Sequence, residues 1–325
     1  MRAFFAIIGI YMHLLLIFMS SIVLSSALTY ALISFFKHFK IGQSIREEGP
    51  QSHISKAGTP TMGGLAILTS ITIISLIFFD LDGKLIALLL VMIGFGLIGL
   101  FDDLIKVTSN NNLGLLPWQK MALQIAVGLL FGAYLIFCWH ETSVTGILKV
   151  LHFNLSWLYL PLIAFLMVGF ANATNLTDGL DGLLAGCLIA AFASFAVIAS
   201  KVFYPDVLGL CIVSIGAIGG FLIFNYHPAK IFMGDAGSLA LGALLCGISI
   251  ILHKEIIFIL IGGIFVAEVL SVMIQVAFFK KTGKRFFKMS PLHHHFELSG
   301  IKETKLVIGF WIVASILGII GILIR

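Results

Sequence analysis

The feature that most constrains this chain is a series of ten long apolar segments. A transmembrane helix needs about 20 predominantly apolar residues to cross the hydrocarbon core of a bilayer. The segments lie at 14–36, 62–79, 85–101, 118–139, 157–175, 183–200, 207–225, 236–252, 256–279 and 305–324. We therefore expect an all-α polytopic integral membrane protein with about ten transmembrane helices, forming a single domain over residues 1–325.

The composition excludes a water-soluble globule. Hydrophobic residues fill 60% of the 325 positions and charged residues only 11%, whereas a soluble domain carries about 25% charged residues. The net charge of +5 is too small to indicate nucleic-acid binding, and cationic loops beside an anionic leaflet account for it. The apolar run after Arg2 continues to Phe36. It is longer than the core of a signal peptide, so we expect a retained first helix.

Lysine and arginine are divided unevenly between the two sets of loops. One set carries 14 of these residues, and the other set together with both termini carries six. Cytoplasmic loops are enriched in lysine and arginine. The richer side is therefore expected to face the cytoplasm, with both termini outside.

The polar motifs all fall in loops on the expected cytoplasmic side. They lie at 55–64, 101–106, 172–182, 225–238 and 291–297. The opposite loops are short or carry no dense cluster of charges. Ordinary connecting loops would divide such motifs between both sides, so this distribution indicates that one face carries the chemistry.

Five carboxylates stand at helix ends on this face: Asp102, Asp103, Asp178, Asp181 and Asp235. Beside hydrocarbon they would repel one another unless protons or a cation share the site. Oxygen ligands favour Mg²⁺ or Mn²⁺ over zinc, and Mg²⁺ completes its shell with substrate phosphates. The start of the eighth expected helix, where Asp235 stands, also favours phosphate. The pattern predicts a diphosphate bound through a metal.

Each motif alone has an ordinary structural explanation. The Asn-Leu-Thr-Asp-Gly segment at 175–179 could be a capped turn, and Lys56 and Lys106 could be positive-inside anchors. Three consecutive histidines at 293–295 most often form a surface loop. Glu268 lies inside the ninth span, where a carboxylate is costly and functional by default, but the pattern assigns it no role.

Five motifs together resemble the polyprenyl-phosphate N-acetylhexosamine-1-phosphate transferases. They are GTPTMGG at 58–64, FDDLIK at 101–106, NLTDGLDG at 175–182, FMGDAGSLALG at 232–242 and PLHHHFE at 291–297. The resemblance runs from about Gly42 to Glu297. The triple histidine and the 42–64 stretch resemble the branch that acts in bacterial cell-wall synthesis. One departure is the 107–114 loop, where relatives often carry several basic residues.

This resemblance implies a transferase of the bacterial cytoplasmic membrane. Its substrates would be UDP-N-acetylmuramoyl-pentapeptide and undecaprenyl phosphate, and its products UMP and the first lipid-linked peptidoglycan precursor, lipid I. Mg²⁺ would be the cofactor. Helices with apolar, lipid-facing surfaces would also permit a homodimer.

The resemblance also implies residue roles. The catalytic residues would be Asp102, Asp103, Asp178, Asp235 and His293, with the metal held by Asp235 and Asn175. Asp181 and the 172–182 loop would border the uridine. The substrate-binding residues would be Lys56, Thr61, Lys106, Asn172, Asn175, Asp181, Asn225, Phe232, Gln275, His294 and His295.

Two mechanisms remain open for such a reaction. A phosphate monoester is mostly dianionic at pH 7 because its second pKa is near 6. The lipid phosphate could therefore attack the β-phosphorus directly, oriented or deprotonated by Asp102 or Asp103. Alternatively, an aspartate could attack first and form an acyl-phosphate intermediate. We favour the direct route because the nucleophile needs little activation.

Two other functions also remain open. A sibling enzyme would transfer N-acetylglucosamine-1-phosphate, and the PLHHHFE loop disfavours it. An ion-coupled transporter would place its acidic residues near the membrane midplane, whereas only Glu268 lies clearly within a span.

Overall fold

The computed structural model describes residues 2–39, 56, 58–108, 114–140, 142–145 and 152–324. Two of the sequence features lie partly outside these ranges. They are the 42–64 stretch, at residues 42–55, and the 107–114 loop, at residues 109–113. The elements are α1 (Arg2–His38), α2 (Gly64–Phe78), α3 (Gly83–Thr108), α4 (Pro117–Trp139), β1 (Ser143–Thr145), β2 (His152–Asn154), η2 (Ser156–Leu158), α5 (Tyr159–Thr177), α6 (Leu183–Lys201), α7 (Pro205–Asn225), α8 (Gly234–Ile251), α9 (Glu255–Ile261), α10 (Gly263–Thr282), α11 (Leu292–Glu297) and α12 (Glu303–Ile324).

The helices confirm the prediction of a polytopic all-α membrane protein. Within the described residues, nine helices are long and apolar enough to cross a bilayer. The shorter apolar helix α2 has 15 residues. The only strands described are β1 and β2, which pair antiparallel in the loop between α4 and α5.

The ninth expected span, 256–279, is not continuous. It is divided into α9 and α10 at Gly262, whose φ of −83° and ψ of 16° leave the helical range. Two consecutive glycines lie at this junction, and glycine readily leaves the helical conformation because it lacks a Cβ atom. The continuous helix predicted there was therefore wrong, although both halves remain apolar.

Helix α8 forms the centre of the bundle. Every residue from Ala236 to Ile251 is buried, and α8 packs against α3, α5 and α2. The peripheral helices α1, α10 and α12 instead expose large apolar side chains such as Val23, Met273 and Ile312. A dense array of large apolar side chains on the outer surface of a helix of about 20 residues is expected where that surface faces lipid.

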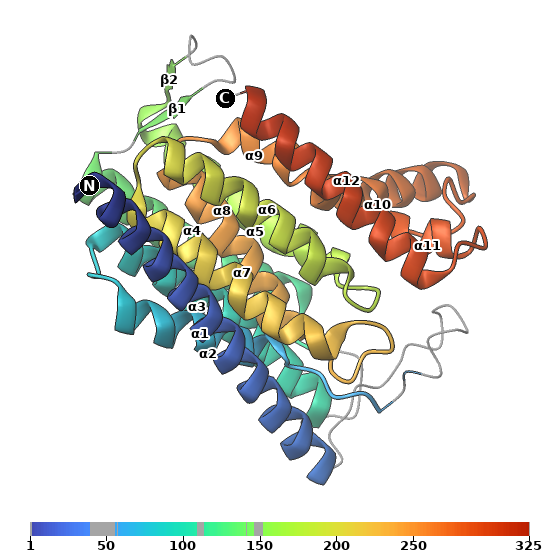
Figure 1. Cartoon of the computed structure of the whole chain (residues 1–325). Helices are drawn as coiled ribbons and strands as arrows, with labels where there is room; N and C mark the ends of the chain where they lie inside the picture. The colour runs from blue at the N-terminus through green and yellow to red at the C-terminus, as the bar shows by residue number, and fades with distance from the viewer. Residues whose placement is uncertain are drawn as a thin grey trace.

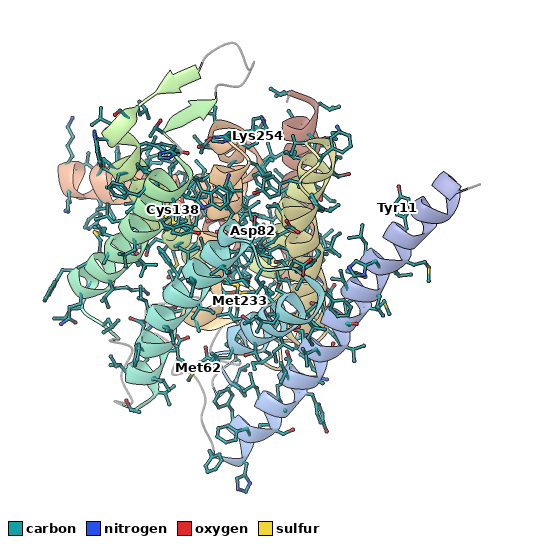
Figure 2. All side chains as sticks on the ribbon, turned by 90° about the vertical axis from the view of Figure 1, so that its left-hand side faces the viewer. Tyr11, Met62, Asp82, Cys138, Met233 and Lys254 are labelled. Atoms are coloured by element: carbon teal, nitrogen blue, oxygen red, sulfur yellow. The ribbon has the colours of Figure 1, made fainter. Side chains whose placement is uncertain are left out.

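The two ends of the bundle differ in content. Both chain termini and the β1–β2 strand pair lie at one end, and the loops with the polar motifs lie at the other (Figure 1). Figure 2 shows the same separation, with Lys254 toward the first end and Met62 and Met233 toward the second.

A close helix crossing brings the polar ends of α3 and α8 together. Gly99 of α3 lies against the backbone of Asp235, and a Cβ atom at position 99 would overlap the Asp235 carbonyl group. Small residues at such crossings let helix backbones approach closely in lipid. This crossing places Asp102 and Asp103, one turn further along α3, beside the start of α8.

We expect Gly99→Ala to lower both the melting temperature and the activity, because the added methyl group must push α3 away from Asp235. An overpacked core substitution costs about 1–3 kcal/mol. Thermal unfolding and UMP release in detergent measure the two effects. Gly219→Ala is the matched control, since nothing lies within 4 Å of a Cβ atom built at position 219. Equal behaviour of the two variants would contradict this account of the crossing.

Candidate active site

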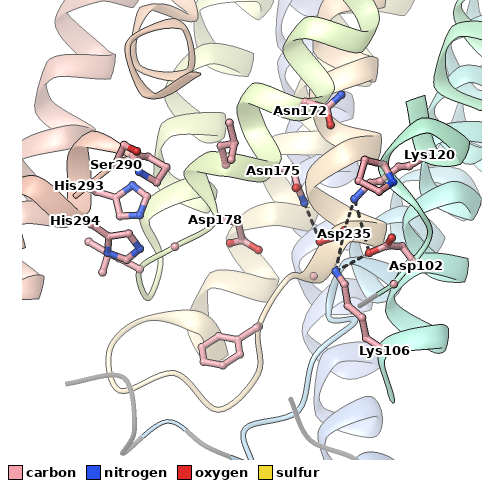
Figure 3. Close-up of a pocket in the computed structure, with 18 of the residues that line it drawn as sticks. Asp102, Lys106, Lys120, Asn172, Asn175, Asp178, Asp235, Ser290, His293 and His294 are labelled. Carbon is pink, nitrogen blue, oxygen red and sulfur yellow. Dashed lines mark hydrogen bonds and ion pairs between the residues drawn. The ribbon is translucent and has the colours of Figure 1, made fainter. Parts of the chain in front are cut away.

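A cleft of about 1510 Å³ opens at the polar end of the bundle. Figure 3 shows His293 and His294 toward one end of it and Asp102, Lys106 and Lys120 toward the other. The predicted site residues that line it are Lys56, Thr61, Asp102, Asp103, Lys106, Asn172, Asn175, Asp178, Asp181, Asn225, Phe232, Asp235, Gln275, His293 and His294. His295 is not among its lining residues. The structure thus brings all but one of the predicted residues to one cavity.

Three carboxylates converge on one wall of the cleft. Oxygen atoms of Asp102, Asp103 and Asp235 lie within 4.8 Å of one another. Oδ2 of Asp103 accepts the backbone N–H of Ala236, at 3.1 Å, in the first turn of α8. Oδ1 of Asp102 accepts the N–H of Leu115 at 2.9 Å. Backbone groups therefore fix two of the three carboxylates, and the cluster has the donor atoms to hold a metal ion.

Two lysines neutralise this cluster. Nζ of Lys106 lies 2.5 Å from Asp102 Oδ2, one helical turn away on α3, and 3.1 Å from Asp235 Oδ2. Nζ of Lys120, at the start of α4, lies 2.5 Å from Asp235 Oδ2 and 3.7 Å from Asp102 Oδ2. Sequence reasoning counted Lys120 only toward membrane orientation, but it is as close to the carboxylates as Lys106.

Asn175 and Asp178 extend the polar wall from the end of α5. The Asn175 amide donates hydrogen bonds to Asp235 Oδ1 at 2.8 Å and to Ser238 Oγ at 2.9 Å. Burial, together with the negative charge of Asp235, raises the pKa of Asp178 to about 7. Asp178 therefore takes up a proton near neutral pH and can donate or accept a hydrogen bond.

We expect Asp178→Asn to stabilise the metal-free protein most at high pH. A carboxyl group whose pKa is raised on folding favours the native state below its unfolded pKa of 3.8, and this contribution is lost as the pH rises through about 7. Asparagine does not ionise. The variant's gain in Tm over wild type should therefore be roughly 2–4 °C larger at pH 8.5 than at pH 5.

Thermal unfolding in detergent with EDTA tests this expectation. The control is Asp80→Asn, since Asp80 is an exposed carboxylate between α2 and α3 at the far end of the bundle. A Tm difference between Asp178→Asn and wild type that does not change with pH would contradict the assignment.

A second polar cluster joins four separate segments at the cleft. Nζ of Lys56 lies 2.7 Å from Asp181 Oδ1 and 2.6 Å from Glu303 Oε1. Nδ1 of His227 lies 2.9 Å from Asp181 Oδ2, and the N–H of Ala229 donates to the same oxygen at 3.0 Å. Asp181 therefore ties the loop after α5 to the loop after α7 and to α12.

Several predicted binding residues use their polar atoms to shape the cleft wall. The Asn225 side chain accepts the N–H of Gly182 at 3.0 Å and donates to the carbonyl of Ile231 at 2.9 Å. The Asn172 amide donates to Gln124 at 2.6 Å. Oε1 of Gln275 accepts two backbone N–H groups of the loop after α10, the shorter at 2.8 Å. These residues line the cleft and also hold its segments in place.

The three histidines have different surroundings. His293 is buried, and its Nδ1 lies 3.2 Å from Glu268 Oε2. Nδ1 of His294 lies 3.1 Å from Glu297 Oε2. His295 instead accepts the backbone N–H of Lys288 at 3.2 Å. The short helix α11 thus directs two of the three rings to the cleft, because successive helical residues point about 100° apart.

Residues missed by sequence reasoning share one property. Lys120, His227 and Glu303 each contact a predicted aspartate that lies far away in the chain. For example, the backbone N–H of Asp181 donates to Glu303, which is 122 residues away. Their only sequence signal is a charged or titratable side chain at the polar end of a span. That signal does not identify the partner.

The fold and the cleft together define a class of protein. A polytopic bundle carries carboxylates and partly buried lysines, side by side, in a large cavity at one end of its helices. Such a site suits phosphate chemistry at a membrane boundary. The class is that of integral membrane transferases.

Comparison with known proteins gives the family. Residues 85–253 match the model of glycosyl transferase family 4, and residues 56–68 match phospho-N-acetylmuramoyl-pentapeptide-transferase signature 1. Enzymes of that name are 50% identical in Halalkalibacterium halodurans (95% of this chain and 96% of the relative), 51% in Staphylococcus carnosus (90% and 92%) and 47% in Bacillus subtilis (93% and 94%). The chain belongs to the phospho-N-acetylmuramoyl-pentapeptide-transferases.

Membership confirms the predicted reaction class. The chain is a glycosyl-1-phosphate transferase of peptidoglycan synthesis, and it uses a nucleotide-sugar and a lipid carrier. This activity is favoured over transfer of N-acetylglucosamine-1-phosphate and over ion-coupled transport.

Proposed function

We propose that the cleft transfers phospho-N-acetylmuramoyl-pentapeptide from UDP to undecaprenyl phosphate, releasing UMP and leaving lipid I. The observation that carries this proposal is the cluster of three carboxylates and two ammonium groups on one wall. Carboxylates bind divalent cations, and ammonium groups bind phosphate oxygens. Both parts of a metal–diphosphate complex therefore have ligands at this wall.

Mg²⁺ is the proposed metal, held by Asp235 and Asn175. Closely spaced carboxylate oxygens suit a hard cation that keeps some water ligands and takes others from phosphate. The Asn175 amide turns its N–H₂ group toward Asp235, and a half-turn of the amide would present its carbonyl oxygen instead. Bound there, Mg²⁺ would neutralise charge on the diphosphate and on the departing UMP.

Lys106 and Lys120 are proposed to complete this neutralisation. Both ammonium groups contact Asp235 Oδ2. Each has three donors, so each can hold the carboxylate and a phosphate oxygen together. They would also lower the repulsion between the dianionic lipid phosphate and the anionic diphosphate, which is the main barrier to their meeting.

The uridine is proposed to lie toward Asp181 and the loop between α5 and α6. Lys56, held there by Asp181 and Glu303, can donate to uracil or ribose oxygens. Thr61, Phe232 and Gln275 also line the cleft. His293 and His294 are proposed to contact the sugar or a phosphate, since hard Mg²⁺ prefers oxygen ligands.

Direct attack by the lipid phosphate is the proposed mechanism. Asp102 and Asp103 are fixed by backbone N–H groups, which suits carboxylates that orient a nucleophile. The lipid phosphate needs little deprotonation at pH 7. A phosphorylated aspartate trapped during turnover would contradict this mechanism and favour the two-step alternative.

The cleft is proposed to face the cytoplasm of a bacterial cell, with both termini outside. The sequence assigns 14 of the 20 lysine and arginine residues to the expected cytoplasmic side, and the polar motifs of the cleft belong to that same side. The prenyl chain can then stay in the bilayer, where burial stabilises it by about 0.8 kcal/mol per CH₂, while its phosphate reaches the nucleotide-sugar.

UMP release by the purified, detergent-solubilised protein tests the proposed function. UDP-N-acetylmuramoyl-pentapeptide is supplied with undecaprenyl phosphate and Mg²⁺ each added or omitted. We expect release only with both present. UDP-N-acetylglucosamine is the control donor and should give none. Release from the control donor, or release without the lipid phosphate, would contradict the proposal.

A further inference from the structure

Glu268 is a carboxylate that the reaction described above does not use. It lies on α10 with 0% of its surface exposed. A buried carboxylate within a membrane span is costly unless it is paired. Its two side-chain oxygens face the same residue, since Oε1 accepts the backbone N–H of His293 at 3.2 Å and Oε2 lies 3.2 Å from Nδ1 of the His293 ring.

His293 is held between Glu268 and the cleft. Its side chain is only 1% exposed, yet it lines the cleft beside Asp178 (Figure 3). The other ring nitrogen, Nε2, lies against Gly179, where a Cβ atom would overlap it. Within the described part of the chain, Nε2 has no hydrogen-bond partner. Glu268 therefore supports the Nδ1 edge of the ring, and the opposite nitrogen, Nε2, is left for another group.

The carboxylate determines what this ring can do. The Glu268 carboxylate beside Nδ1 can accept a hydrogen bond from that nitrogen, which fixes the orientation of the ring. Low polarity around the pair strengthens this effect. The approach of 3.2 Å lacks the alignment of a hydrogen bond, as is common for catalytic contacts before substrate binds. The His294 ring lies beside that of His293, with 4.2 Å between the two ring centroids.

We propose that Glu268 is a positioning residue that acts through His293. Its carboxylate holds the ring in place, so that Nε2 is presented to the bound nucleotide-sugar. The inference rests on the proposed role of His293 in the cleft. It gives the buried acid of α10 a function in the transfer step rather than in packing alone.

Steady-state kinetics of Glu268→Gln test this inference. Glutamine keeps the size of the side chain and removes its charge. We expect kcat for UMP release to fall about 30-fold or more, with KM for the nucleotide-sugar within about threefold and Tm within about 3 °C of wild type. The matched control is Glu255→Gln, since Glu255 is also buried but pairs with Tyr159 at the far end of the bundle. Its kcat should not change.

The same substitution in a His293→Ala background separates positioning from structure. If Glu268 acts through His293, Glu268→Gln should lower kcat by less than about threefold once the ring is gone. An additive loss, or a wild-type kcat for Glu268→Gln alone, would overturn the inference but leave the proposed function intact. A wild-type kcat for His293→Ala would overturn the inference together with the proposed role of His293. If Glu268→Gln does not fold, Glu268→Asp replaces it in the wild-type and His293→Ala backgrounds. The same outcomes then support or overturn the inference.

Discussion

Asp235→Asn is expected to lower kcat for UMP release by about 10³-fold or more, the largest effect of any substitution considered for this protein. Among the residues that the structure describes, Asp235 is the one carboxylate that contacts both lysines and Asn175. Asparagine preserves the shape of the side chain, so α8 should still pack against α3. The loss would then come from the missing charge, which leaves both ammonium groups without their shared partner and removes the proposed ligand of the metal.

The control for Asp235→Asn must remove a carboxylate from a similar helical position outside the cleft. Asp206 meets this requirement, since it lies in the first turn of α7 as Asp235 lies in the first turn of α8. Asp206→Asn should keep kcat within about twofold of wild type. A similar kcat for Asp235→Asn would show that the carboxylate cluster is not the reaction centre.

Lys120→Met is expected to lower kcat by about 10²- to 10³-fold. Its ammonium group lies 2.5 Å from Asp235 and 3.7 Å from Asp102, at the wall where the diphosphate is proposed to bind. Methionine retains most of the apolar stem but cannot neutralise charge. Arginine should restore only part of the activity, because its planar fork differs from a compact ammonium group.

Lys305→Met is the control for Lys120. Lys305 lies in α12 near the same end of the bundle, but it is exposed and does not line the cleft. Its loss should leave kcat and KM close to wild type. A comparable decrease in both variants would mean that overall positive charge, rather than contact with Asp235 and Asp102, supports the reaction.

The helices could be predicted from the sequence because each must cross the same apolar layer. Apolar length alone identified α6 and α8 to within two residues at each end, whereas α3 continues seven residues beyond its predicted end at residue 101. It could not detect the break between α9 and α10, because the residues on both sides of Gly262 are equally apolar. Nor did it predict that α2 would be only 15 residues long.

The candidate site was predictable in its carboxylates and not in their partners. An aspartate at a helix end has an ordinary structural explanation by itself, so Asp102, Asp103 and Asp235 could be selected only because the polar motifs all fall on one expected face. Lys120 and Asp235 are 115 residues apart, and Lys56 and Glu303 are 247 apart. Such pairs depend on how the helices pack, and a single sequence does not specify that.

The partner of Glu268 could not be predicted from the sequence either, although α10 and α11 are neighbours in the chain. Its position inside an apolar span indicated a function, but the residue it serves became visible only when α11 was placed against α10. The His293 contact spans 25 residues, and the intervening loop has no periodic pattern from which the distance could be deduced.

The central claim is that Asp235 holds a divalent metal on which the diphosphate of the nucleotide-sugar binds. Electron paramagnetic resonance of Mn²⁺, used in place of Mg²⁺, tests it most directly with purified wild-type protein, Asp235→Asn and UDP-N-acetylmuramoyl-pentapeptide. We predict one tightly bound Mn²⁺ in wild type, with ³¹P hyperfine coupling that appears when the nucleotide-sugar is added, and loss of both in Asp235→Asn. Mn²⁺ that binds equally well to the variant, or that shows no coupling to phosphorus, would contradict the account.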